Sequence, residues 1–224
     1  MPCRVPGDTS ACAALILRAA MYPGQRFNAY SHLAGLLLAL GGAVLLLRDI
    51  VPRGDAQKIA AAAVFALSVV LLYAASTATH SVRGRSYGFW QRMDHCAVYL
   101  LIAGTYTPFA LAAPLVVWSG ALLAGIWVLF GFGVWRELHT RAGDRPAVGL
   151  YLVMGWISVV GAMCAPGHLP AFAVALLLAG AGCYTLGTVF YRNRRGLKHA
   201  HGIWHLLVLA GTTTHYLAIG LYVL

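Results

Sequence analysis

Long stretches without a charged side chain constrain the fold of this chain more than any other feature of its sequence. Asp, Glu, Lys and Arg are missing from 27–47, 59–82, 95–135, 146–191 and 199–224. An α-helix needs about 20 consecutive apolar residues to cross the hydrocarbon core of a bilayer. The first, second and last stretches each fit one such helix, and the other two are long enough for two helices each.

Proline and glycine divide the two longer stretches. Pro108 and Pro114 are expected to frame a turn in one of them, and the APGHLP run at 165–170 is expected to break the other. The sequence therefore predicts an all-α membrane protein, a bundle of seven transmembrane helices at 27–47, 58–80, 93–112, 115–135, 147–164, 169–190 and 202–223. Only 10% of the residues are charged, against about 25% in a soluble domain.

Basic residues are distributed unequally between the two sets of loops that seven spans create. Thirteen of the 16 Lys and Arg residues lie on the side of the N-terminus, and the other side has only Arg48, Arg53 and Lys58. Basic loops stay in the cytoplasm, so we expect the N-terminus inside and the C-terminus outside. The membrane thus accounts for the net charge of +10, and we expect the lipid bilayer, not nucleic acid, as the partner.

Two segments follow from this pattern. Residues 1–21 are expected to be an N-terminal cytoplasmic segment that can be disordered, and residues 22–224 form the membrane domain. Within that domain, small residues recur along the fourth and sixth predicted spans, where they favour close helix contacts in lipid. They are Gly120, Gly125, Gly131, Gly133, Gly180, Gly182 and Gly187.

Polar side chains gather at the ends of four predicted helices. Because successive helices run in opposite directions, all of these ends lie at the cytoplasmic depth of the membrane. Ionisable groups inside a membrane span are costly and mark functional sites, so convergence at one depth favours a shared site. The residues are Asn28, Ser31 and His32 in the first helix, Ser76 and His80 in the second, Asp94 in the third, and His201 and His205 in the seventh.

Spacing within these helices indicates a metal site. His201 and His205 are four residues apart on one helix face, as are the two histidines of the HExxH zinc motif, and Ser76 and His80 share this spacing. Three imidazoles with an open fourth position suit a catalytic zinc. Asp94 would accept a hydrogen bond from the zinc-bound water or act as its base. In the alternative interpretation, the histidines only hydrogen-bond between helices or extend to the membrane interface.

The remaining histidines are expected outside the ligand set. His95 points about 100° away from Asp94 around a helix, and His215 is too deep to reach the same ion, although it can line a cavity. His32 shares the depth of the site and can support it. Three others are expected in loops or exposed: His139, His168 and His199.

Four blocks of sequence resemble the hemolysin III family, the bacterial branch of the progestin and adipoQ receptor superfamily. They are NAYSH at 28–32, Ser76-x3-His80, MDHCAVYLLIAGTYTPF at 93–109, and HGIWHLLVL at 201–209, which His215 follows. The blocks occur in the family's order and spacing, and the resemblance runs from about residue 22 to the C-terminus. Gln25 departs from it, because bacterial relatives often have an acidic residue there.

The resemblance implies seven helices in the bacterial cytoplasmic (inner) membrane and a zinc ion held by His80, His201 and His205. It further implies that Asp94 contacts the zinc-bound water and that Ser76 lies within reach of it. The same arrangement in related membrane hydrolases supports cleavage of lipid amides such as ceramide. The expected function is therefore that of a zinc-binding membrane protein that hydrolyses lipid amides.

Two further hypotheses remain open at this stage. The family name implies a pore-forming or hemolytic protein, although no helix has a row of charged residues to line a pore. Alternatively, the chain is a non-catalytic regulator of membrane state in which zinc holds the helices together.

Overall fold

The computed structural model describes residues 24–111, 117–140, 146–164 and 169–224. These residues form seven α-helices and two short 3-10 turns, without a strand among them. The elements are α2 (Arg26–Ile50), η1 (Val51–Arg53), α3 (Ala56–Ser81), η2 (Gly84–Ser86), α4 (Tyr87–Leu111), α5 (Val117–His139), α6 (Val148–Met163), α7 (Ala171–Arg192) and α8 (Ala200–Tyr222). The seven predicted helices are confirmed, and the predicted N-terminal segment 1–21 lies outside the described residues.

The prediction for Pro108 was wrong. Instead of framing a turn, Pro108 lies inside α4, which continues to Leu111. Proline inside a helix removes one N–H donor and clashes with the carbonyl one turn earlier. Pro108 is close enough to the end of α4 for the helix to continue only one more turn beyond it. Pro114 and residues 165–168 of the second predicted break lie outside the described residues.

Local chemistry fixes several helix ends. Asp55 caps α3, because its side chain accepts hydrogen bonds from the backbone N–H groups of Gln57 and Lys58. The preceding Gly54 has a φ of 72°, a left-handed conformation that glycine adopts at little cost. At the other end of the bundle, α7 stops at Asn193, which is also left-handed, as asparagine often is after a helix.

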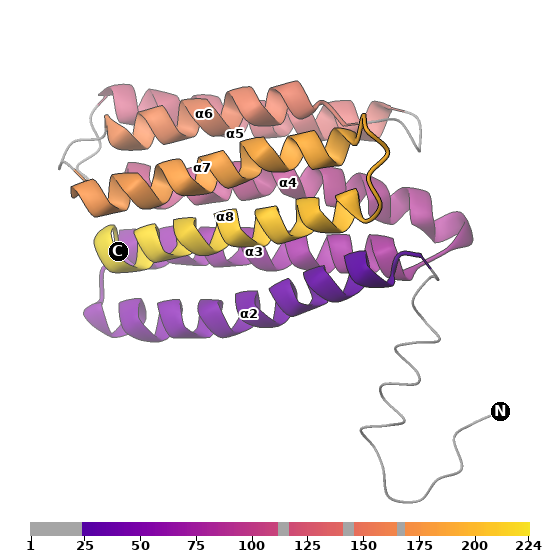
Figure 1. Cartoon of the computed structure of the whole chain (residues 1–224). Helices are drawn as coiled ribbons and strands as arrows, with labels where there is room; N and C mark the ends of the chain where they lie inside the picture. Colours follow the sequence, from indigo (N-terminus) through magenta and orange to yellow (C-terminus); the bar gives the residue numbers. More distant parts are fainter. Residues whose placement is uncertain (1–23, 112–116, 141–145, 165–168) are drawn as a thin grey trace, which may run out of the picture.

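Consecutive helices run antiparallel to one another (Figure 1). The beginnings of α2, α4 and α8 and the end of α3 therefore lie at the same end of the bundle, where the chain enters α2. Helix α3 supplies much of the buried core, with Phe65, Leu72 and Tyr73 almost fully covered. Tyr99 and Tyr106 of α4 complete the centre of the bundle.

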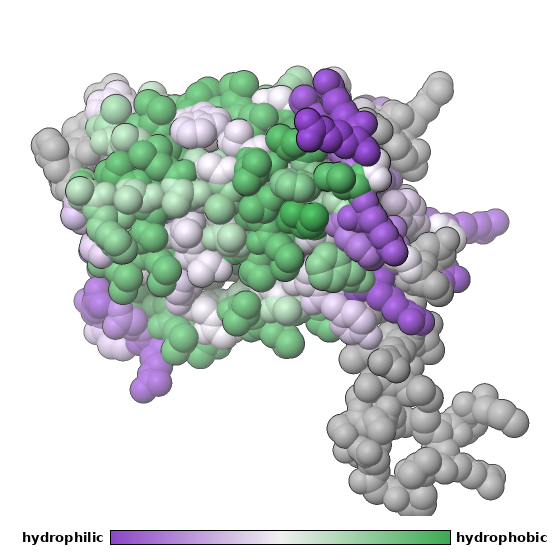
Figure 2. All heavy atoms as spheres, viewed as in Figure 1, coloured by the Kyte–Doolittle hydropathy of each residue, from purple (hydrophilic) through white to green (hydrophobic). Residues whose placement is uncertain are grey.

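The surface of the bundle suits a bilayer. Leu37, Leu38, Val44, Val128 and Leu221 are all more than half exposed. A broad hydrophobic band covers the middle of the molecule, and hydrophilic side chains lie at its two ends (Figure 2). In a membrane protein the lipid tails cover such a band, whereas in water it would be an aggregation hazard.

By length and apolar composition, four of the described helices are sufficient to cross a membrane. They comprise 26–53, α3, 118–139 and α7. Helix α6 is apolar but has only 16 residues. Helices α4 and α8 contain more polar residues and lie beside the apolar helices in the same bundle (Figure 1). The chain is thus a multi-pass membrane protein that folds as a seven-helix bundle.

The predicted glycine contacts are confirmed for three of the seven glycines. Gly133 packs against the ring of Tyr99, Gly180 against His215 and Gly187 against Trp204. The other four have nothing within 4 Å of the position that a Cβ atom would take: Gly120, Gly125, Gly131 and Gly182. Regular recurrence along a helix therefore does not distinguish glycines in a helix contact from those that face lipid.

Candidate metal centre

Three imidazole rings meet where α3 ends and α8 begins. The candidate ligand nitrogens of His80, His201 and His205 all lie within 4.8 Å of one another. The Nε2 atoms of His80 and His201 are 3.3 Å apart. Two nitrogens bound tetrahedrally to zinc at roughly 2.0–2.1 Å lie about 3.3 Å apart. The three predicted ligands thus form a group that can hold a metal ion.

Hydrogen bonds orient two of these rings. Nδ1 of His205 lies 3.1 Å from the backbone oxygen of Asn28, which can only accept a hydrogen bond. Nδ1 of His205 therefore has the proton, and Nε2 has the lone pair that a metal needs. The Ser31 hydroxyl lies 3.1 Å from the same Nδ1 atom and donates to the same Asn28 oxygen. Ligating histidines typically donate their second N–H to a carbonyl or carboxylate in this way.

Gln25 provides the corresponding contact for His80. Its Oε1 atom lies 3.0 Å from Nδ1 of His80 and accepts a hydrogen bond from the side chain of Asn28. The Asn28 amide thus holds the Gln25 carbonyl toward the imidazole, so that Nε2 of His80 is free for a metal. Gln25 is the residue that departs from the family pattern, and a carboxylate at this position would accept the same hydrogen bond.

Asp94 and Ser76 contact each other beside this group. The Ser76 hydroxyl donates to Oδ2 of Asp94 over 3.4 Å, and Ser76 is only 1% exposed. Both residues line the same cavity as the three histidines. The structure therefore brings together all five residues that the sequence singled out, on α3, α4 and α8.

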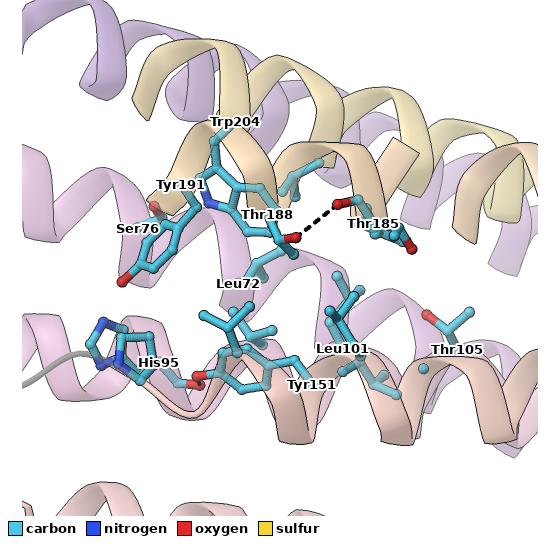
Figure 3. A pocket seen from close by; sticks show the side chains of 18 of the residues that line it. Leu72, Ser76, His95, Leu101, Thr105, Tyr151, Thr185, Thr188, Tyr191 and Trp204 are labelled. Carbon is cyan, nitrogen blue, oxygen red and sulfur yellow. Dashed lines mark hydrogen bonds between the residues drawn. The ribbon is translucent and has the colours of Figure 1, made fainter. Parts of the chain in front are cut away.

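The cavity next to the histidines has a volume of about 190 Å³ and extends between α3, α4, α6, α7 and α8. Ser76, His95 and Tyr191 lie at one end, Leu72 and Leu101 follow, and Thr185 and Thr105 lie at the other end (Figure 3). Phe109 also lines it, fifteen residues after Asp94 on α4. At 1.5 Å per residue, these lining positions of α4 cover about 22 Å of the helix.

Two other histidines lie along this cavity. The His32 ring stacks on His205 with a centroid distance of 3.5 Å, and neither of its nitrogens has a hydrogen-bond partner. His215 lines the deeper part and lies 3.1 Å from the carbonyl oxygen of Leu177 through Nε2. These positions agree with the supporting place expected for His32 and the cavity position expected for His215.

The remaining histidine predictions have mixed outcomes. His199 is exposed, as expected. His139 is exposed too, but it is the last residue of α5 and not part of a loop. His168 lies outside the described residues. His95 is not part of the group of three histidines, as expected, but its side chain lines the same cavity.

Glu137 was missed by reasoning from the sequence alone. This carboxylate is 2% exposed on α5, where its Oε1 accepts from Arg136 over 3.0 Å and its Oε2 lies 3.3 Å from Nδ1 of His95. Because Glu137 follows Arg136 directly after an apolar stretch, it resembles an ordinary loop charge. A buried polar cluster near the middle of the bundle was missed too. There the hydroxyls of Tyr73 and Tyr184 both contact Thr212, over 3.1 and 2.9 Å.

Comparison with known proteins identifies the family of this chain. A family model described as "Haemolysin-III related" matches residues 22–216. "Hemolysin-3" of Bacillus cereus is 34% identical over 199 residues, which are 88% of this chain and 90% of the relative. "Hemolysin-3 homolog" of Bacillus subtilis (strain 168) is 32% identical over 87% of this chain and 92% of its own.

A more distant relative is the human "Monocyte to macrophage differentiation factor". It is 26% identical over 205 residues, 87% of this chain and 82% of the relative. The match to the family model includes every residue of the candidate site, from Gln25 to His205. The chain therefore belongs to the haemolysin-III-related family of membrane proteins.

Proposed function

We propose that this protein binds zinc and hydrolyses lipid amides of the ceramide type within the bilayer. The single observation that carries the proposal is the place of the three grouped histidines, beside a long and mainly apolar cavity that Asp94 and Ser76 also line. Such a cavity suits one acyl chain, with the polar group of the lipid next to the metal site.

Each site residue has a specific part in this proposal. His80, His201 and His205 would hold the zinc ion, with His80 and His205 oriented by Gln25 and Asn28. Zinc supplies a Lewis acid for a carbonyl oxygen and a more acidic bound water. The Asp94 carboxylate would take a proton at the reacting centre. Ser76 holds that carboxylate in place through its hydroxyl.

Metal analysis of purified protein tests the zinc site. We expect wild type to contain zinc, and His80→Ala and His205→Ala to lose it, because two nitrogens are too few for tight binding. His139→Ala is the matched control, since His139 is an exposed histidine on α5, and it should keep its zinc. Zinc that stays bound in both site variants would show that the ion is held elsewhere.

Fatty-acid release from defined N-acyl amides tests the hydrolysis. Zinc-loaded wild type should release fatty acid, and Asp94→Asn should lower the rate about 10²–10⁴-fold while keeping its zinc. Ser76→Ala should have a smaller effect, because it removes only one hydrogen bond to Asp94. A zinc-containing wild type that releases no fatty acid from amides of graded chain length would rule out the enzyme.

A hemolytic function is the second candidate, because the relative from Bacillus cereus is named "Hemolysin-3". Conductance through liposomes that contain the purified protein would support it, provided that His205→Ala leaves the conductance unchanged. A non-catalytic regulator is the third candidate. There His80→Ala would lower the melting temperature of the protein in detergent, and no N-acyl amide would be turned over by wild type.

We further propose that the protein lies in the bacterial inner membrane with its N-terminus, including residues 1–21, in the cytoplasm. The excess of Lys and Arg on one set of loops supports this orientation. It places the candidate metal site toward the cytoplasmic side of the membrane, because that site lies at the end of the bundle where the chain enters α2.

A further inference from the structure

The pair formed by His95 and Glu137 has no part in the function proposed above. Glu137 is one of the few carboxylates of the chain and is buried near the end of α5. A buried ionisable group in a membrane span is costly and calls for a functional explanation. Its two oxygens have different partners: Oε1 accepts a hydrogen bond from Arg136, and Oε2 contacts Nδ1 of His95.

This contact sets the tautomer of His95. A carboxylate oxygen only accepts hydrogen bonds, so Nδ1 of His95 must donate its proton to Glu137. In the neutral imidazole the other nitrogen, Nε2, then has a lone pair and accepts a hydrogen bond.

The His95 ring lies at one end of the cavity. It lines the cavity together with Asp94 and His201, and it lies at the same end as Ser76 and Tyr191 (Figure 3). The Tyr151 hydroxyl fixes the backbone beneath the ring by donating to the His95 carbonyl over 2.9 Å. The His95 ring thus borders the space where the polar group of a bound lipid would lie.

We propose that His95, held by Glu137, is a specificity residue that accepts a hydrogen bond from an N–H or O–H group of the cavity's occupant. An amide with an N–H group satisfies this acceptor, whereas an ester of the same shape leaves it without a partner. The site therefore selects secondary amides over esters. This inference rests on the proposed function only in taking a lipid with a polar group as the occupant.

Three ligands of nearly equal shape separate this hydrogen bond from the rest of the site. N-methyldodecanamide has the N–H group, methyl dodecanoate replaces it with oxygen, and N,N-dimethyldodecanamide replaces its hydrogen with a methyl group. Calorimetry on zinc-loaded protein in nanodiscs would measure their affinities. We expect wild type to bind the secondary amide about tenfold more tightly than the ester, the effect of one buried hydrogen bond.

Two variants test the assignment to His95. His95→Phe keeps a ring of similar size without the acceptor, and should bind amide and ester equally. In Glu137→Gln, Arg136 keeps the side-chain oxygen, so the NH₂ group faces Nδ1 of His95. The ring proton then moves to Nε2, which becomes a donor, and the ester should bind more tightly than in wild type. His139→Phe, on the exposed side of α5, should retain the preference of wild type.

The outcomes are distinct from those for the hydrolase itself. Zinc content is measured in each variant, and it should stay at the level of wild type. A preference for the secondary amide that depends on His95 supports the inference even if no ligand is turned over. Equal affinities in wild type, no binding of any of the three ligands, or an unchanged preference in His95→Phe would overturn it. Glu137→Gln provides the decisive result if His95→Phe does not fold.

Discussion

Gln25 and His80 are fifty-five positions apart in sequence, yet the amide oxygen of one lies 3.0 Å from Nδ1 of the other. The contact matters because a histidine that ligates through Nε2 needs its proton on Nδ1, and an acceptor there holds the ring in that state. The Asn28 side chain supports the acceptor by donating to the same oxygen. The departure from the family pattern at Gln25 thus preserves an acceptor while removing a charge.

Substitution of Gln25 should change zinc affinity without touching a ligand. Gln25→Ala removes the acceptor and should weaken zinc binding about 10–100-fold, the usual effect of losing such a partner. Gln25→Glu supplies a stronger acceptor and should bind zinc at least as tightly as wild type. Competition with a chelator in detergent would measure both. An affinity of Gln25→Ala equal to that of wild type would mean that His80 is oriented by other contacts.

At this scale the sequence predicts the ligands better than their partners. His201 and His205 share a helix face by simple periodicity, and the pairing of Ser76 with His80 follows the same rule. The contacts of Gln25, Asn28 and Glu137 depend on how helices rotate against each other. Hydrophobic and charge patterns do not specify that rotation, so these contacts could be recognised only in the structure.

Helix α7 allows a matched comparison at the scale of the element. Gly180 and Gly182 lie two residues apart, but a Cβ atom on Gly180 would clash with the His215 ring and lie 2.6 Å from Oγ1 of Thr214. The corresponding position on Gly182 has nothing within 4 Å. Helix α7 can approach α8 closely only because residue 180 has no side chain.

Alanine at these two positions should therefore have opposite effects. Gly180→Ala forces α7 and α8 apart and should destabilise the bundle by about 1–3 kcal/mol, the range for overpacking a core. Gly182→Ala should be neutral or slightly stabilising, because alanine is the better helix former. Thermal melting of both variants in detergent would compare them. Equal melting temperatures would indicate that the α7–α8 contact is loose enough to absorb a methyl group.

The helices themselves were predicted well, and the misses have physical causes. Charge-free stretches locate membrane spans because a charge in hydrocarbon is expensive. They do not locate helix ends outside the hydrocarbon, so α4 begins at Tyr87 and includes charged Arg92, whereas the predicted helix begins at residue 93. Pro108 was assigned to a turn because proline usually ends a helix, but it costs less near a helix end than in the middle.

For the whole molecule, the prediction of a shared site came from helix direction alone. Alternating directions put the start of α2, the end of α3 and the starts of α4 and α8 at one end of the bundle, and the structure has them there (Figure 1). From the sequence, the site side chains could be placed only at one common depth of the membrane, without their contacts. The shape of the cavity could not be anticipated, because it depends on the distance of α6 and α7 from the other helices.

The orientation of the whole bundle in the membrane is the last prediction. Thirteen of 16 Lys and Arg residues lie, by the alternation of the seven spans, in sequence segments on the side of the N-terminus, and basic loops are retained in the cytoplasm. Alkaline phosphatase folds only outside the cytoplasm, so a fusion after Leu224 should be enzymatically active. Green fluorescent protein that is exported in unfolded form does not fluoresce. A fusion of it after Leu224 should therefore be dark, whereas a fusion of it at the N-terminus should fluoresce.

A charge variant then tests the cause of this orientation. Neutralising Arg192, Arg194, Arg195 and Lys198 removes the positive charges at the end of α7 and in the loop before α8. In part of the molecules the last helix should then be inverted or not inserted. Neutralising Arg48, Arg53 and Lys58 on the opposite side should only strengthen the original bias. If the unmodified chain gave a fluorescent C-terminal fusion and an inactive phosphatase fusion, its topology would be the opposite of the predicted one. The metal site would then open toward the outside of the cell, and a lipid substrate would have to come from the outer leaflet.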